Sequence, residues 1–173
     1  SDPAIYAGGD CVEVRHLVSG DSVPMPLGSL ANRQGRVIAT NIDGGAAGFS
    51  GTVGTFCIKV FDLGISTAGL TMVQARAAGF DPICSIVSQG DHAHFYPESE
   101  MIYMVLIADR KSRRILGVQA AGNRGEAVKA RVDAEFGSGG KLVAGEDAKE
   151  SAGMFRGTGS GSLEGFVRGR IIE

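Results

Sequence analysis

The sequence has almost no excess charge and no long apolar run, and each shortage argues against a class of protein. Seventeen basic and nineteen acidic residues leave a net charge of −2, which gives no electrostatic argument for nucleic acid or an anionic membrane as a partner. No apolar run approaches the roughly 18 residues of a membrane span, and the first residues lack the basic and apolar regions of a signal peptide. We therefore expect a cytoplasmic protein.

Cysteine is also scarce. Cys11, Cys57 and Cys84 lie far apart and show no metal-ligand spacing. Their odd number does not indicate a disulfide framework. We expect three buried free thiols.

Glycine, in contrast, is plentiful, with 27 of 173 residues. Up to residue 134 the glycines separate apolar runs, whereas residues 137–169 are polar and glycine-rich with little periodicity. Residues 135–173 are therefore predicted to form a flexible or non-native tail. The Gly-Ser-Gly-Gly that follows Phe136 is typical of a cloning junction, and both origins of the tail stay open.

The first fifty residues predict one strand and one helix. Residues 5–7 are an apolar run that predicts the end of a buried strand, and the glycine pair after them allows a tight turn into Asp10. Apolar residues at helical spacing then predict a helix with Ser29 as its N-cap. Gly35 within this helix suggests close packing against another backbone.

Residues 50–134 alternate short apolar runs with turns, which predicts an α+β domain. We expect an antiparallel sheet with helices on one face. The last two of its four strands form a hairpin through a polar turn. The strands are expected at residues 54–64, 82–89, 101–109 and 114–122.

Two helices are expected in the same domain. Thr71 is predicted to be an N-cap with Gln74 as its capping-box partner, and Gly79 marks the end of this short helix. The second helix is expected at residues 125–134.

Several motifs in this order carry a family resemblance. "IYAGGDCVE", "PLGSLANRQGRVIATNI", "GTVGTFCIKVFDLGISTAGLT", "ARAAGF", "HAHFYP" and "RILGVQAAG" together resemble the C-terminal portion of FAD-dependent pyridine nucleotide-disulfide oxidoreductases. The branch they resemble is that of coenzyme A-disulfide reductase, NADH oxidase and persulfide reductase. The resemblance implies that residues 1–45 are the last strand and helix of an FAD-binding domain, residues 46–134 a dimerisation domain, and residues 135–173 the tail.

The resemblance also implies cofactor contacts in the first region. It places Asp10, after Gly9, at the ribityl hydroxyls of FAD, where a carboxylate can accept hydrogen bonds from a sugar-alcohol chain. Taken alone, a Gly-Asp pair is more typical of a turn or cap than of a ligand-binding carboxylate. Leu27, Gly28 and Ser29 would bring a helix N-terminus to the anionic edge of the reduced flavin. The alternative is a helix that merely packs on a sheet.

"DHAHFYP" is the second chemical candidate. His92 and His94 have the H-x-H spacing of paired metal ligands, but no third ligand is near them in sequence. In the family that the chain resembles, the tyrosine of this segment reaches across the dimer toward the partner's redox cysteine. The resemblance therefore implies that Tyr96 contributes to catalysis in the other subunit.

The expected function follows from what matches and what does not. The parent enzyme would pass electrons from NAD(P)H through FAD to a disulfide, a persulfide or oxygen. This sequence contains no G-x-G-x-x-G loop, and none of its cysteines occupies the family's redox position. We therefore expect a homodimeric, non-catalytic fragment that binds neither cofactor and lacks the FAD and NAD domains that would be its partners. The alternative is a stand-alone dimerisation module without a redox role.

Overall fold

The computed structural model describes residues 2–92, 97–125 and 171–172. The chain divides into two compact units, Ser1–Gly54 and Thr55–Glu173. The predicted helix at 125–134 lies outside the described residues except for Gly125, and most of the predicted tail lies outside them as well. The predicted division at residues 45 and 134 stays a prediction.

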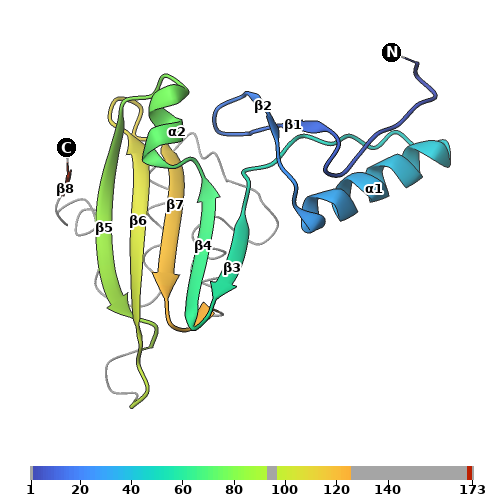
Figure 1. Ribbon diagram of the computed structural model, residues 1–173. Helices are drawn as coiled ribbons and strands as arrows, with labels where there is room; N and C mark the ends of the chain where they lie inside the picture. The colour runs from blue at the N-terminus through green and yellow to red at the C-terminus, as the bar shows by residue number, and fades with distance from the viewer. Residues whose placement is uncertain (1, 93–96, 126–170, 173) are drawn as a thin grey trace. The chain divides into compact units, whose positions relative to one another are not determined.

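The first unit holds a small hairpin and one long helix (Figure 1). Strand β1 (Glu13–Arg15) pairs antiparallel with β2 (Ser22–Pro24), and helix α1 spans Gly28–Ile42. Thr52 returns to this hairpin through a parallel bridge with His16. The apolar side chains buried in this unit are Val14, Val18, Leu30 and Val53.

Three predictions for this unit are wrong. Residues 5–7 are not a strand, because no described strand lies beside them to accept their backbone hydrogen bonds. Leu27, not Ser29, is the N-cap of α1, since its carbonyl accepts the N–H groups of Leu30 and Ala31 at 2.9 and 3.0 Å. A Cβ on Gly35 would meet nothing within 4 Å, so this glycine makes no close backbone contact.

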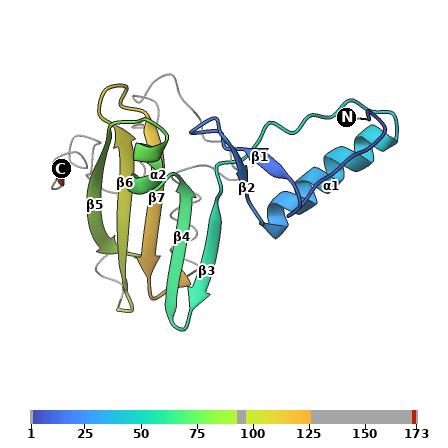
Figure 2. The same cartoon turned by 45° about the horizontal axis from the view of Figure 1, so that its top comes forward.

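The second unit contains an antiparallel sheet with the order β3-β4-β7-β6-β5-β8, of which Figure 2 shows strands β3 to β7. Its α+β class is the predicted one, and every neighbouring pair in the sheet is antiparallel. The strands are β3 (Phe56–Val60), β4 (Leu63–Gly69), β5 (Pro82–Gly90), β6 (Met101–Asp109), β7 (Ile115–Gly122) and β8 (Ile171–Ile172).

The single strand expected at residues 54–64 is in fact a hairpin. Val60 pairs with Leu63, so Phe61 and Asp62 form a two-residue turn between β3 and β4. Phe61 adopts a φ of 53° there, a conformation that glycine or asparagine usually supplies. The described part of the sheet therefore has more strands than the four predicted.

Helix α2 (Met72–Ala77) confirms the prediction from its capping residues. Thr71 and Gln74 form the expected capping box, with the Gln74 N–H donating to Thr71 Oγ1. Gly79, at a φ of +83°, ends the helix, and the N–H of Phe80 donates to the Ala75 carbonyl at 3.1 Å. Residues next to each other in the sequence therefore set both the start and the end of this helix.

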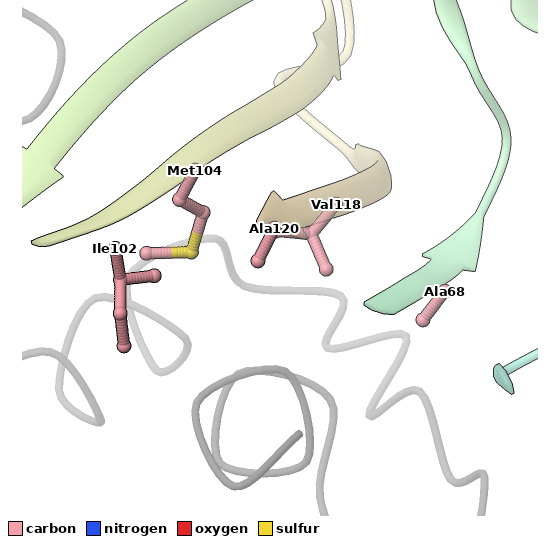
Figure 3. Close-up of a cluster of buried hydrophobic side chains, with 5 residues drawn as sticks. All are labelled: Ala68, Ile102, Met104, Val118 and Ala120. Atoms are coloured by element: carbon pink, nitrogen blue, oxygen red, sulfur yellow. The ribbon is translucent and has the colours of Figure 1, made fainter. Parts of the chain in front are cut away.

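One face of the sheet carries a buried apolar cluster. Pairing of β4, β7 and β6 places its side chains on the same face (Figure 3). The cluster consists of Ala68, Ile102, Met104, Val118 and Ala120. Alternate residues of the same strands must face the other way.

None of the three cysteines forms a disulfide in the described chain, and the burial expected for them is wrong for two. Cys11 is exposed in the turn that follows Asp10, and Cys57 is exposed on the edge strand β3. Cys84 is partly buried on β5.

Candidate functional site

The Gly-Gly turn before Asp10 lies tightly against α1. A Cβ on Gly8 would stand 3.0 Å from Ile38 Cδ1 and 3.2 Å from Gln34 Cβ, so a larger residue would require these side chains to shift by a few tenths of an ångström. Gly9 has a φ of +86°, a conformation that glycine adopts without strain. Both glycines are therefore needed for the turn to pack here.

A buried side chain of α1 also bonds to this turn. Gln34 is only 7% exposed, and its Oε1 accepts the backbone N–H of Gly9 at 2.7 Å. The sequence pattern places Gln34 in the buried stripe of α1 but gives it no role. A polar residue in an apolar stripe is the signal that could have identified it.

Asp10 itself lies at the first corner of a turn closed by the N–H of Val12, which donates to the Gly9 carbonyl at 3.3 Å. Its side chain is exposed, and no described group bonds to its carboxylate. The carboxylate is thus free to accept hydrogen bonds from a ligand.

The Gly9–Asp10 turn lies beside the N-terminal end of α1. Gly9 is beside Ala31, whose Cβ would be 3.7 Å from a Cβ on Gly9, and Ala31 is in the first turn of α1. Within the described chain, the N–H groups of Gly28 and Ser29 have no acceptor, and a Cβ on Gly28 would meet open space. The structure therefore brings the predicted residues of this region to one end of α1.

The second candidate, at the β5–β6 connection, is only partly described. His94 and Tyr96 lie outside the described residues, so the role of Tyr96 stays a prediction. His92 is described, and its Nδ1 lies 2.9 Å from Asp91 Oδ1. The described residues hold no group of three His, Cys, Asp or Glu side chains that could bind a metal.

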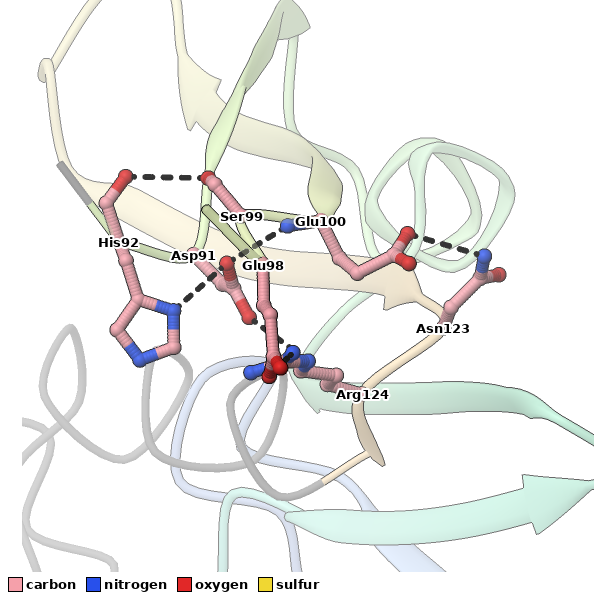
Figure 4. Close-up of polar contacts among 7 residues, drawn as sticks. All are labelled: Asp91, His92, Glu98, Ser99, Glu100, Asn123 and Arg124. Atoms are coloured by element: carbon pink, nitrogen blue, oxygen red, sulfur yellow. Dashed lines mark hydrogen bonds and ion pairs between the residues drawn. The ribbon is translucent and has the colours of Figure 1, made fainter. Parts of the chain in front are cut away.

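Asp91 anchors the described ends of this connection (Figure 4). Its fully buried side chain accepts the N–H of Glu100 at 2.9 Å, and Arg124 Nε lies 3.6 Å from Oδ2. Arg124 also reaches Glu98, with 3.3 Å between Nη2 and Oε2. The Glu100 N–H, aided by His92 and Arg124, holds the pKa of Asp91 below its usual value. Oδ2 is buried without a hydrogen bond in the described chain.

The face of the sheet opposite the buried cluster exposes several large apolar side chains. Register places them on one face, and each is between 41% and 57% exposed. We call them the open face: Phe56, Ile58, Val60, Leu63, Ile86, Met101 and Tyr103.

Residues 55–137 match the family model of the pyridine nucleotide-disulphide oxidoreductase dimerisation domain. This part of the chain therefore belongs to that domain family. The chain is 34% identical over 119 residues to the NAD(P)H coenzyme A polysulfide/persulfide reductase of Pyrococcus horikoshii, covering 69% of this chain and 27% of that protein.

Solved structures show the same relationship. A NAD-dependent persulfide reductase from A. fulgidus is 43% identical, with a TM-score of 0.73, over 76% of this chain and 24% of that one. A FAD-dependent pyridine nucleotide-disulphide oxidoreductase from Desulfovibrio vulgaris is 38% identical, with a TM-score of 0.72. The match covers 87% of this chain and 34% of that one. The chain thus spans about a quarter to a third of these relatives. Across the described residues, no helix has the length and apolar character that crossing a membrane requires.

Proposed function

We propose that this chain is the C-terminal region of a cytoplasmic flavoprotein that passes electrons from NAD(P)H through FAD to a disulfide, a persulfide or oxygen. The second unit serves as its dimerisation domain, and the first contributes to the FAD site. The match of residues 55–137 to the dimerisation-domain family supports this assignment. The FAD-dependent oxidoreductase among the relatives supports the flavin chemistry, and the NAD-dependent persulfide reductase supports a nicotinamide donor and a persulfide acceptor.

The observation that carries the flavin assignment is the turn at Asp10. Among the described residues, the exposed carboxylate of Asp10 has no bonding partner, and it lies at the end of α1 where two backbone N–H groups also lack acceptors. In the proposed site, Asp10 accepts hydrogen bonds from the ribityl hydroxyls. Leu27, Gly28 and Ser29 present the positive end of α1 to the flavin's anionic edge. Bound there, FAD would supply the electron relay between nicotinamide and acceptor.

The isolated chain is proposed to be inactive and to bind neither cofactor. One charge-assisted hydrogen bond contributes about 1.5–3 kcal/mol, whereas association itself costs at least about 4 kcal/mol. The Asp10 contact alone therefore gives an affinity for FAD no tighter than roughly millimolar. In the complete enzyme, Tyr96 would act beside the partner subunit's redox cysteine.

Replacement of Asp10 in the full-length flavoprotein tests the cofactor assignment. Asp10→Ala should lower the flavin content after purification, because the ribityl chain loses an acceptor. The dimer should persist, because Asp10 belongs to the first unit. Asp43→Ala is the matched control, since Asp43 is an exposed carboxylate at the opposite end of α1. Full flavin occupancy in Asp10→Ala, or a dissociated dimer, would contradict the assignment.

A stand-alone dimerisation module is the second candidate, and the open face of the sheet favours it. The two candidates differ in whether longer gene products carry flavin. Absorbance at the flavin bands distinguishes them, because a full-length product without flavin bands supports the module alone.

A further inference from the structure

Gln34 is a polar side chain of α1 that is buried beside the turn at Asp10. In the described chain, the buried residues of this helix are Leu30 and Gln34. Burying an amide side chain is unfavourable unless it forms hydrogen bonds. A methionine of similar length would fill the same space without that cost. What glutamine adds at this position is the 2.7 Å bond from the Gly9 N–H to Oε1.

This bond acts on the residue directly before Asp10. The N–H of Gly9 is held by Gln34, and the carbonyl of Gly9 is held by the N–H of Val12. Gly9 is at a φ of +86°, where a glycine without these bonds has many other conformations available. Fixing both polar groups of Gly9 sets the direction in which the chain enters Asp10.

Packing against α1 restrains the two glycines of the turn unequally. Gly8 is confined by Ile38 and Gln34, but the nearest atom to a Cβ on Gly9 is Ala31 Cβ at an ordinary contact distance of 3.7 Å. Side-chain contacts with α1 therefore confine Gly9 less closely than Gly8. In the described chain, the Gln34 bond is the polar contact by which α1 holds the Gly9 backbone.

We propose that Gln34 is a positioning residue that holds the Gly9–Asp10 turn ready for the polyol chain of a flavin cofactor before that cofactor arrives. This inference rests on the proposed role of Asp10. Gln34 does not touch the cofactor; it acts through the Gly9 backbone. Preorganisation of this kind raises affinity because the turn loses no further freedom on binding.

Two substitutions separate the hydrogen bond from the packing. Gln34→Met keeps the length and removes the acceptor, while Gln34→Glu keeps an acceptor oxygen at the same position. Gln119→Met is the matched control, since Gln119 also bonds to a backbone group but lies on β7 in the second unit.

The first measurement is amide hydrogen exchange of Gly9 by NMR in the 173-residue chain. Gly9 should be protected in the natural sequence and in Gln34→Glu. It should exchange about tenfold faster in Gln34→Met, the change expected for loss of one hydrogen bond. Gln119→Met should leave Gly9 unchanged. An unprotected Gly9 in the natural chain overturns the proposal whether or not any variant folds.

The second measurement is the dissociation constant for FAD in the full-length flavoprotein. Gln34→Met should weaken FAD binding about tenfold. Gln34→Glu should bind FAD about as tightly as the natural sequence, because it keeps the acceptor oxygen. If Asp10→Ala loses FAD but Gln34→Met does not, the role of Asp10 stands and that of Gln34 is overturned. If Asp10→Ala keeps its FAD, the proposed function itself fails, and Gln34 only stabilises the turn.

Discussion

At the scale of single residues, His16 is the group whose protonation should control the stability of the first unit. It is 5% exposed, and its Nδ1 accepts the N–H groups of Val18 and Ser19 at 3.3 and 3.4 Å. Burial lowers the pKa of His16, although the Val53 carbonyl and the Asp21 carboxylate oppose the shift. Both bonds require an unprotonated Nδ1, so the folded unit favours neutral His16.

The sign of the pH effect follows from this shift. Below the ordinary histidine pKa of about 6.5, the unfolded chain binds more protons than the folded one. The stability of the first unit should therefore be complete above that pH and should fall as the pH drops through the lowered pKa of His16. His16→Asn keeps an acceptor oxygen near the Nδ1 position but does not titrate. Exchange of the Val18 and Ser19 amides between pH 5 and 7.5 tests this, and an equal pH dependence in His16→Asn would contradict it.

The candidate site could be predicted only in part, because some of the residues that form it are far apart in the sequence. The motif around Asp10 identifies a glycine turn and a carboxylate, and the structure shows both. Gln34 is 25 residues away, and its bond to Gly9 appears only when the turn is folded onto α1. Sequence periodicity shows which face of a helix is buried, but it does not show what a buried polar side chain bonds to.

At the scale of elements, the N-cap of α2 should control how firmly this short helix forms. Thr71 Oγ1 accepts the Gln74 N–H at 3.3 Å, and Gln74 Oε1 accepts the Thr71 N–H at 2.9 Å. Thr71→Ala removes the first acceptor and should lower the free energy of unfolding by about 1 kcal/mol. Thr71→Ser keeps the hydroxyl and should cost much less. Urea unfolding of the variants measures both, and equal losses would argue against the cap.

The elements also show which parts of the fold sequence reasoning reaches. The prediction of helix α2 is correct because Thr71, Gln74 and Gly79 mark its ends within the sequence itself. Sequence reasoning misses the β3–β4 hairpin because its turn residues, Phe61 and Asp62, are neither glycine nor asparagine. The apolar run therefore looks like one continuous strand. The strand expected at residues 5–7 is wrong because a strand depends on neighbours that the run itself does not specify.

At the scale of the whole molecule, the open face of the sheet is the feature that predicts self-association. Met101 and Tyr103 of β6 are among its exposed residues. The large apolar side chains of β7 are buried or partly buried. Most of the open face comes instead from the β3–β4 hairpin. Large apolar side chains exposed together on one sheet face are typical of an interaction surface.

We therefore predict a homodimer that buries the open face, in line with the domain family of residues 55–137. Sedimentation of the chain at micromolar concentration should give twice the mass of one chain. Tyr103→Glu should weaken the dimer about a hundredfold or more, because a carboxylate buried against apolar side chains loses its hydration. Ile42→Glu is the control, since Ile42 is 70% exposed but belongs to the first unit.

The outcome with Tyr103→Glu decides whether association uses the open face of the sheet. The side chains of the buried cluster point away from Tyr103, because successive residues of a strand alternate between faces. Loss of the dimer without loss of folded structure, judged by far-UV circular dichroism, assigns association to the open face. A dimer that survives Tyr103→Glu but dissociates in Ile42→Glu would place association in the first unit. That result would remove the role proposed here for the second unit, because its apolar face would then have no partner copy.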